Sequence, residues 1–213
     1  MSLAPDDDAA LRWRTYGRWT GLNLLVFGAL YPLVNWLTGV RASTFGLYLD
    51  SERGIPFLPL WIWAYLSINL LFVLPPLFMR TSDMPLLGRR MLVATVAGCL
   101  IFLLLPARLG FERVAPAGGL HGVVFGGLFR ADGPHNLVPS LHVTYASLCI
   151  LSFQAAARDW RARAAWGLWL VAIMASTVLV HQHHLLDVAS GLLLALVICR
   201  WMRAPDQGAA RAA

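Results

Sequence analysis

The sequence predicts an all-α membrane protein, a bundle of six transmembrane helices with both termini in the cytoplasm. Of its 213 residues, 58% are hydrophobic and only 13% are charged, which leaves too little polar surface to cover a water-soluble domain of this size. Six apolar stretches approach the roughly 20 residues that a spanning helix needs. The arginines are divided unevenly among the connections between these stretches, and this asymmetry orients the bundle.

The six stretches occupy most of the chain, at approximately 19–38, 57–79, 91–107, 141–157, 164–181 and 185–202. The second contains Asn69 and two consecutive prolines, and the fourth contains several hydroxyl side chains. Both are better suited to packing against neighbouring helices than to facing lipid. We therefore expect one membrane domain over 19–203, preceded by a cytoplasmic segment over 1–18 and followed by a disordered tail over 204–213.

All seventeen basic residues are arginines. Twelve lie in the N-terminal flank, the 80–90 and 158–163 loops and the C-terminal tail, and five lie in the alternate connections. The positive-inside rule then puts the connections 39–56, 108–140 and 181–185 outside the cytoplasm. Because no cleavable signal segment precedes the first span, we expect an integral protein of a bacterial inner membrane whose site faces the periplasm or the cell exterior.

Charge and cysteine usage exclude several classes of protein. The net charge of +6 suits contact with anionic lipid headgroups, whereas nucleic acid is a poor partner because the arginines are scattered between apolar spans. The cysteines are odd in number, lie in separate spans and lack Cys-x-x-Cys spacing, which argues against disulfides and thiolate metal sites. They are predicted to be packing residues: Cys99, Cys149 and Cys199.

The longest connection, over 108–140, is too long for a simple loop, and such connections are usually functional or disordered. Its middle, from Gly118 to Phe129, is apolar rather than hydrophilic. This segment fits an interfacial or re-entrant piece at the membrane surface, and it fits a flexible apolar loop equally well.

A histidine and a carboxylate stand one helical turn apart where the fifth span meets the sixth. These are His183 and Asp187. A carboxylate beside a membrane core is costly without a partner, so the pair indicates a function. At the start of the fourth span, Pro139 and Ser140 are suited to begin a helix, whose free N–H groups and positive dipole end attract an anion. His142 follows in the first turn, although Ser140 taken alone is equally typical of a simple helix cap.

The predicted topology gathers three clusters on the same outer face, each from a different connection. Four of the six histidines lie in or beside two of these clusters, so a shared site explains their positions better than chance does. The clusters are Arg108 with Arg113, Ser140 with His142, and His183 with Asp187.

This combination of groups is suited to phosphoryl transfer through a phosphohistidine. A neutral imidazole such as that of His183 attacks phosphorus, while a carboxylate such as Asp187 fixes its tautomer and stabilises the imidazolium that forms. A second, protonated histidine donates to the leaving alkoxide, which contributes roughly 10²–10⁴-fold. Arginines and a helix N-terminus neutralise the phosphoryl oxygens. The scheme requires no metal or other cofactor.

At these residues the chain resembles the type 2 phosphatidic acid phosphatase superfamily. Pro139-Ser140-Leu141-His142, and the stretch from Ser176 to His183 and Asp187, are similar to its second and third signature motifs. The resemblance is close over 135–191 and looser over 108–113, where the first, basic motif belongs. It implies a six-helix membrane core that dephosphorylates lipid phosphates. It further implies roles by position: His183 as nucleophile, Asp187 as its orienting partner, His142 as acid, and Ser140, Arg108 and Arg113 as phosphate ligands.

The chain departs from the family pattern at three positions. Leu141 stands where the second motif usually has glycine, Thr177 stands where the third motif has arginine, and Val114 follows Arg113 where the first motif ends in Arg-Pro. The phosphate pocket is therefore short of one arginine unless Arg108, Arg113 or Arg130 replaces it. The form of these motifs resembles a branch that includes inositol-phosphorylceramide synthases and bacterial modules fused to a dual-specificity phosphatase domain.

Three functions follow as expectations. The first is hydrolysis of a lipid phosphate or polyprenyl pyrophosphate, and the second is transfer of a phospho-headgroup to an alcohol at the same site. A third, from another class, is a metal- or haem-binding membrane protein with His142, His181 and His184 as ligands and Asp187 orienting one of them. This last reading explains neither Pro139-Ser140 nor the outer arginines.

Overall fold

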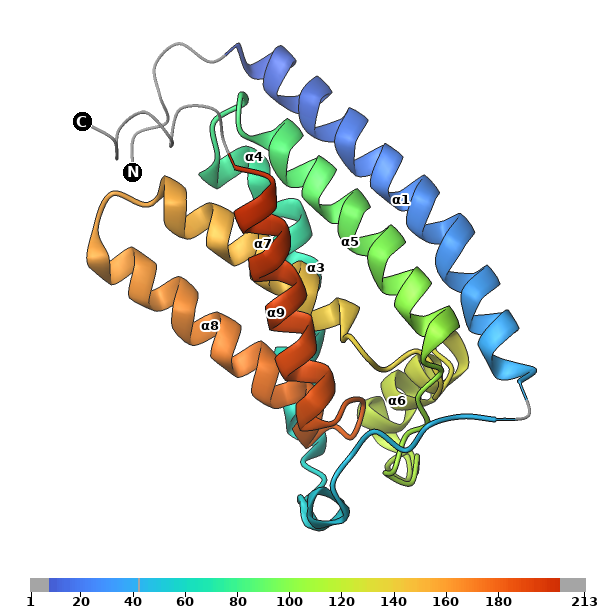
Figure 1. Cartoon of the computed structure of the whole chain (residues 1–213). Helices are drawn as coiled ribbons and strands as arrows, with labels where there is room; N and C mark the ends of the chain where they lie inside the picture. Colours follow the sequence, from blue (N-terminus) through green and yellow to red (C-terminus); the bar gives the residue numbers. More distant parts are fainter. Residues whose placement is uncertain (1–7, 42, 204–213) are drawn as a thin grey trace.

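A computed structural model describes residues 8–41 and 43–203 of the chain. These residues fold into helices, with no strand beyond an isolated parallel bridge between Phe45 and Ala107, so the all-α prediction is confirmed. The tail over 204–213, predicted to be disordered, lies outside the described residues. The long helices, seen in Figure 1, are α1 (Ala9–Gly39), α5 (Met84–Leu104), α7 (Leu141–Ala156), α8 (Trp160–Leu179) and α9 (Leu185–Trp201).

Three of the described helices, α1, α5 and α8, are long and apolar enough to cross a membrane by length and composition. The helix α7 and the helical segment 59–73 are apolar but shorter. The membrane character expected from composition therefore agrees with the structure, while six spans with both termini in the cytoplasm stay a prediction.

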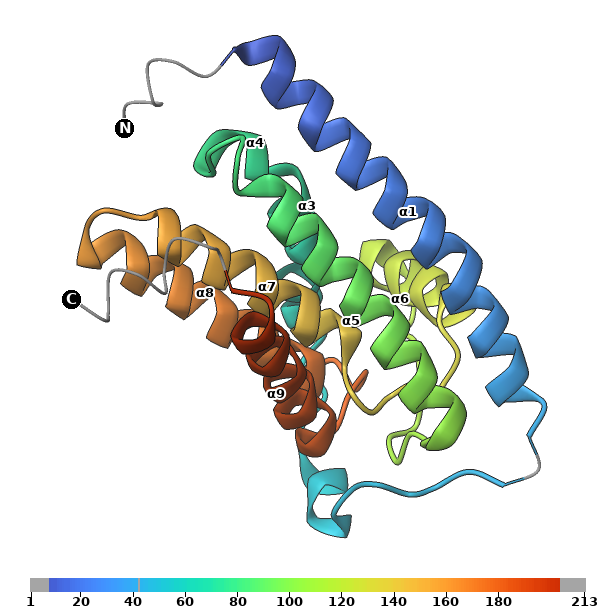
Figure 2. The same ribbon diagram turned by 45° about the horizontal axis from the view of Figure 1, so that its top comes forward.

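The first helix starts ten residues earlier than the apolar pattern predicts. Asp8 caps α1, since its Oδ1 accepts a hydrogen bond from the Ala10 N–H at 2.9 Å, so much of the expected N-terminal segment is helical. Helix α1 then runs along α5 (Figure 2). The two helices approach closely because Gly88 has no side chain: a Cβ there would lie 2.6 Å from the ring of Trp19.

The second predicted span is not one continuous helix. It comprises a short 3-10 turn and three helical pieces: η2 (Pro59–Trp61), α2 (Ile62–Leu66), α3 (Ile68–Val73) and α4 (Pro75–Phe78). The first break falls at Ser67, whose Oγ donates to the Ala64 carbonyl at 2.6 Å and accepts from Trp169 Nε1 at 2.8 Å. The second falls before Pro75, which has no N–H to continue the helix.

Helix α7 occupies the centre of the bundle, in contact with α5, α8 and α9 (Figures 1 and 2). Its residues are buried on nearly all sides, which confirms that the fourth apolar segment belongs to the interior rather than to a lipid face. The hydroxyl of Thr144 donates to the carbonyls of Ser140 and Gly191 at 2.8 and 3.0 Å. The hydroxyl of Thr144 is thus paired within the bundle.

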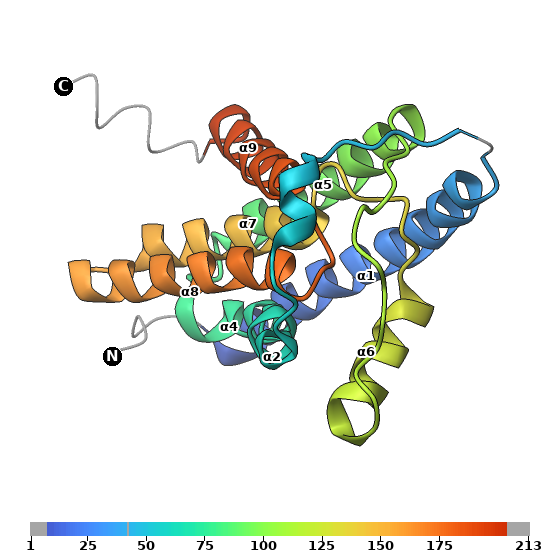
Figure 3. The same ribbon diagram turned by 90° about the horizontal axis from the view of Figure 1, so that it is seen from below.

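The connections predicted to share one face meet at one end of the bundle, where Figure 3 shows them from outside. The first contains η1 (Asp50–Gly54), and the long one contains α6 (Gly119–Ala131), which projects at the side of the bundle. The apolar stretch from Gly118 to Phe129 is therefore mostly helical. Backbone hydrogen bonds link the first connection to the long one, from the Phe45 N–H to the Pro106 carbonyl and from the Arg108 N–H to the Phe45 carbonyl, both at 2.8 Å.

Candidate active site

The turn between α8 and α9 carries the histidines of the third motif. The carbonyl of Thr177 accepts hydrogen bonds from the backbone N–H groups of Gln182 and His183, both at 3.0 Å. His181 has a left-handed backbone conformation, with φ of 56°. Such a conformation is unfavourable for a residue with a side chain and persists only where the surroundings hold it. The turn is therefore constrained immediately before α9 begins.

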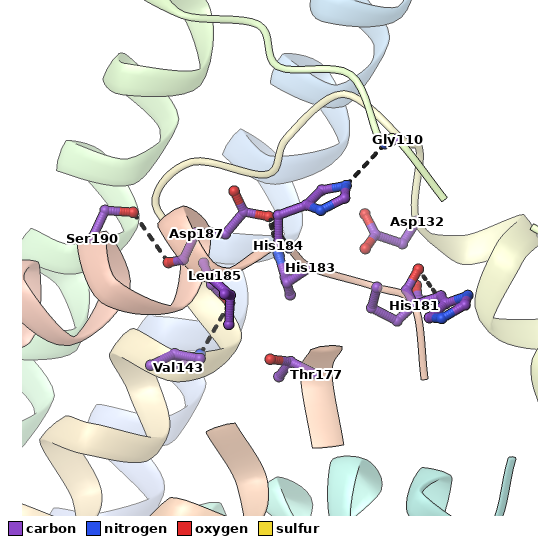
Figure 4. A network of polar contacts seen from close by, with 12 residues as sticks. Gly110, Asp132, Val143, Thr177, His181, His183, His184, Leu185, Asp187 and Ser190 are labelled. Carbon is purple, nitrogen blue, oxygen red and sulfur yellow. Dashed lines mark hydrogen bonds and ion pairs between the residues drawn. The ribbon is translucent and has the colours of Figure 1, made fainter. Parts of the chain in front are cut away.

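His183 and Asp187 lie in hydrogen-bond contact, as their spacing predicts. His183 Nδ1 is 3.2 Å from Asp187 Oδ2, and the same oxygen accepts the His184 N–H at 2.8 Å. Both side chains are buried, and Figure 4 shows Asp187 beside the two histidines. A carboxylate at Nδ1 accepts the proton of that nitrogen, which leaves Nε2 of His183 as the nucleophilic nitrogen.

Ser140 caps α7 and joins it to α9. Its Oγ accepts the Val143 N–H at 3.3 Å, and its own N–H donates to the Asp187 carbonyl at 3.0 Å. The residue is fully buried and does not line the cavity beside the histidines. The hydroxyl of Ser140 therefore acts in this structure as a helix cap, while its backbone brings the second and third motifs together.

His142, in the first turn of α7, packs against an aromatic ring. Its imidazole stacks on Tyr65 with the ring centroids 4.0 Å apart. Within the described part of the chain, its Nε2 has no hydrogen-bond partner. A buried polar atom without a partner is uncommon in a folded protein and indicates a place for a ligand or water.

A cavity of about 570 Å³ has both His142 and His183 in its wall. The cavity also extends along α1, whose lining residues Tyr16 and Tyr31 are roughly 22 Å apart at 1.5 Å per helical residue. Apart from a few polar groups such as Asp132, its wall is made of apolar and aromatic side chains. Examples are Leu24, Phe27, Phe72, Met84 and Met91.

Arg113 lies close to the cavity but does not line it. Its Nη1 donates to the Asp132 carbonyl at 2.6 Å, and its guanidinium lies 5.4 Å from the centroid of the Phe129 ring. Its Nε and Nη2 are buried with no hydrogen-bond partner among the described residues. The Asp132 carboxylate does line the cavity, and it accepts a hydrogen bond from the Tyr31 hydroxyl.

The other expected phosphate ligands are not gathered at the cavity. Arg108 and Arg130 are exposed, and neither contributes to the cavity wall. Thr177, at the position of the family's third-motif arginine, is buried and donates its hydroxyl to the Met174 carbonyl at 2.8 Å. The structure thus brings together Ser140, His142, His183 and Asp187, whereas Arg108, Arg113 and Arg130 do not line the cavity.

Glu52 is a residue of this region that the sequence analysis did not identify. It is only 4% exposed, and its Oε2 accepts hydrogen bonds from His184 Nδ1 at 3.1 Å and from the Leu185 N–H at 2.8 Å. Its Oε1 accepts the Leu49 N–H at 3.0 Å. Burial alone would raise the pKa of Glu52, but these hydrogen bonds outweigh it and hold the pKa below its ordinary value. No sequence pattern indicates this role, because Glu52 is only an acidic residue in the connection over 39–56.

His184 is fully occupied by these contacts. Its Nε2 accepts the Gly110 N–H at 2.9 Å, so its proton lies on Nδ1 and is donated to Glu52. Burial lowers the pKa of His184, and the nearby carboxylates of Asp187 and Glu52 oppose this only in part. A ring with both nitrogens engaged is not a metal ligand. Among the described residues no three acidic, histidine or cysteine side chains are grouped to hold a metal ion.

No family model, curated protein or solved structure matches this chain. The resemblance to the phosphatase superfamily therefore depends on the motif residues of the sequence alone.

Proposed function

We propose that this protein is an integral membrane lipid phosphatase that works through a phosphohistidine on His183. One observation carries the proposal: His183 is hydrogen-bonded to Asp187 at 3.2 Å, and it shares the wall of one cavity with His142. A histidine oriented by a carboxylate, with a second histidine across a common space, is the arrangement that nucleophilic and general-acid catalysis requires.

The reaction proceeds in two steps. His183 Nε2 attacks phosphorus, the bond from phosphorus to the lipid oxygen breaks, and His142 gives a proton to that oxygen so that the lipid leaves as an alcohol. Water then attacks the phosphohistidine, His142 takes its proton, and inorganic phosphate leaves His183. Asp187 stabilises the positive charge on the His183 ring while the nitrogen–phosphorus bond exists.

The cavity supports a lipid as substrate. A long, mainly apolar space that starts at the two histidines and follows α1 is suited to an acyl or prenyl chain, because burying apolar surface is favourable. The phosphate at the end of that chain would then lie against His142 and His183.

Unsatisfied donors close to the cavity support an anionic group there. The buried Nε and Nη2 of Arg113 and the buried Nε2 of His142 have no hydrogen-bond partner within the described residues. Phosphate oxygens accept such bonds, and charge-assisted bonds from a guanidinium are among the strongest in proteins. We therefore assign Arg113, rather than the exposed Arg108, as the arginine that faces the phosphate.

Transfer to an alcohol is the alternative outcome at the same site, because an alcohol can replace water in the second step. The polar groups beside the histidines, including the Asp132 carboxylate in the cavity wall, offer hydrogen-bond acceptors to an alcohol. In either reaction, the positive-inside rule puts the site on the periplasmic or exterior side of a bacterial inner membrane.

Phosphate release from purified protein tests the proposal. The substrates are phosphatidic acid, phosphatidylglycerophosphate, a polyprenyl pyrophosphate and a ceramide-linked phospholipid, each in detergent micelles with a metal chelator and with or without candidate alcohols. We expect free phosphate from at least one lipid without added metal, whereas a new phosphate monoester of the added alcohol would identify transfer.

The same assay includes two histidine variants. His183→Ala should abolish both turnover and the acid-labile phosphoprotein, whereas His121→Gln, which changes a histidine outside the cavity, should leave both intact. Full activity in His183→Ala would refute the proposed mechanism.

A further inference from the structure

Glu52 connects the outer connection between α1 and η2 to the start of α9. It lies in η1, far from the third motif in the chain, yet its carboxylate accepts hydrogen bonds from the His184 ring and the Leu185 N–H. A carboxylate is well suited to this place, because the first N–H groups of a helix lack partners and carry partial positive charge. Glu52 therefore fixes the first turn of α9 from outside the helix.

The His184 ring is held on every side. It stacks on Tyr48 at 4.5 Å and on Phe111 at 4.3 Å between ring centroids. Its two nitrogens bond to Glu52 and to the Gly110 N–H, as Figure 4 shows for Gly110. Residues from the connections 39–56 and 108–140 thus determine where the His184 ring lies.

His181, on the other side of His183, is also fixed by the outer connections. Its Nε2 lies 2.9 Å from the Ile55 carbonyl, to which it donates, and its ring stacks on Phe111 with centroids 4.0 Å apart. These contacts hold the left-handed backbone of His181, which is unfavourable in isolation. The segment 48–55 therefore restrains the histidine turn on both sides of His183.

The restraint reaches the site through the backbone of His184. Its N–H donates to Asp187 Oδ2, the same oxygen that binds His183 Nδ1. A shift of the His184 ring would move this N–H and with it the carboxylate that orients His183. Catalytic groups require positions accurate to a fraction of an ångström, and a misplacement of about 1 Å can cost roughly 100-fold in rate.

We infer that Glu52 is a positioning residue for the His183–Asp187 pair, acting through the ring and backbone of His184. The inference rests on the proposed function, since it assigns Glu52 a part in phosphoryl transfer at that site. Glu52 does not line the cavity, so we expect it to make no contact with the substrate. It acts on the rate of the chemical step rather than on binding of the lipid.

Steady-state kinetics of the full-length protein test this inference. The substrate is phosphatidic acid in detergent micelles, or another lipid of the panel if the wild type cleaves that lipid instead. Glu52→Ala should lower kcat by about 10–100-fold with KM within about twofold. Glu52→Gln should recover part of kcat, because a single amide oxygen at the place of Oε2 accepts from both His184 and Leu185, while the amide nitrogen loses the bond from the Leu49 N–H. The matched control is Asp50→Asn, an exposed acidic residue of the same η1, which should behave as the wild type.

The outcomes separate the two proposals. A wild type that cleaves no lipid phosphate refutes the proposed function. If the wild type is active, two results refute the positioning role alone. One is an unchanged kcat in Glu52→Ala, and the other is a loss of kcat in Glu52→Ala that Glu52→Gln does not recover. If Glu52→Ala does not fold, Glu52→Asp replaces it. This variant keeps the negative charge, but its side chain is one methylene too short to reach His184. The inference then requires a lower kcat at unchanged KM in Glu52→Asp as well.

Discussion

The backbone N–H of Ser140 donates to the carbonyl of Asp187 at 3.0 Å. This bond joins the first turn of α7, which carries His142, to the first turn of α9, where Asp187 holds His183. The two proposed catalytic histidines are thus related by backbone contacts of buried helix ends rather than by a flexible loop. Groups on rigid elements keep their geometry better than groups on loops, which is what a preorganised site requires.

Gly191 makes this contact between α7 and α9 possible. A Cβ at Gly191 would lie 2.5 Å from the Ser140 carbonyl oxygen, and a backbone atom cannot swing away. We expect Gly191→Ala to lower the free energy of unfolding by about 1–3 kcal/mol, in spite of the higher helix propensity of alanine. Thermal unfolding in detergent measures the change. The control is Gly127→Ala in α6, where nothing lies within 4 Å; equal unfolding temperatures in both variants would contradict the close packing.

Asp187→Asn separates charge from geometry at the proposed site. One oxygen of Asp187 accepts both hydrogen bonds, from His183 Nδ1 and from the His184 N–H, so the single amide oxygen of asparagine preserves both contacts. What is lost is the negative charge opposite the imidazolium. Because hydrogen bonds to charged groups contribute about 1.5–3 kcal/mol, we expect kcat to fall roughly 10–100-fold in an otherwise stable protein. An unchanged rate would make Asp187 only a structural helix-end partner.

The two arginines of the long connection should differ in their effect on turnover. Arg113 is partly buried and has two nitrogens without a partner among the described residues, whereas Arg108 is exposed. We expect Arg113→Gln to reduce kcat/KM for a lipid phosphate by about 10-fold or more, since a lost charge-assisted bond is worth about 1.5–3 kcal/mol. Arg108→Gln should stay within about twofold of the wild type. The reverse order in the phosphate-release assay would assign the phosphate to Arg108.

The pair of Glu52 and His184 makes stability depend on pH. Folding lowers the pKa of His184 from 6.5, chiefly through burial, and lowers the pKa of Glu52 from 4.5 through its hydrogen bonds. The unfolded chain therefore binds protons more readily at both groups. Each group contributes fully to the free energy of unfolding at a pH above its ordinary pKa, and this contribution declines as the pH falls below that pKa. We expect the unfolding temperature to drop between about pH 7.5 and about pH 5.5.

A variant isolates the contribution of His184 to this pH dependence. Glutamine at this position keeps a donor and an acceptor but does not titrate. His184→Gln should therefore show a flatter decline than the wild type over the same pH range. An equally steep decline in both proteins would assign the pH dependence to other groups.

Part of the fold could be predicted because it depends on local composition and spacing. The apolar content predicts the all-helical class, and the hydroxyl-rich pattern after Ser140 predicts that α7 is interior. The spacing of His183 and Asp187 predicts their contact, because residues four apart lie on the same face of a helix. In the structure the contact instead joins the turn before α9 to the first turn of that helix. The cap at Ser140 follows equally from its position before an apolar helix.

Other features could not be predicted, because partners distant in the chain decide them. Composition cannot show that the helix of the second apolar stretch breaks at Ser67, where the Trp169 ring supplies a hydrogen bond. Nothing near Glu52 in the sequence indicates its partner His184. Arg108 and Arg113 are alike by sequence, and only their burial separates them.

The sequence by itself therefore determined the all-helical class of the protein and the residue types of its proposed site, because hydrophobic content, helical spacing and residue type are local properties. Only the tertiary structure decided which polar groups have partners. In the folded chain His142 and His183 line one cavity, and the two nitrogens of His184 bond to Glu52 and to the Gly110 N–H. Two nitrogens of Arg113 have no hydrogen-bond partner among the described residues. A buried hydrogen bond depends on the close approach of two chain segments, and that approach is a property of the packed bundle.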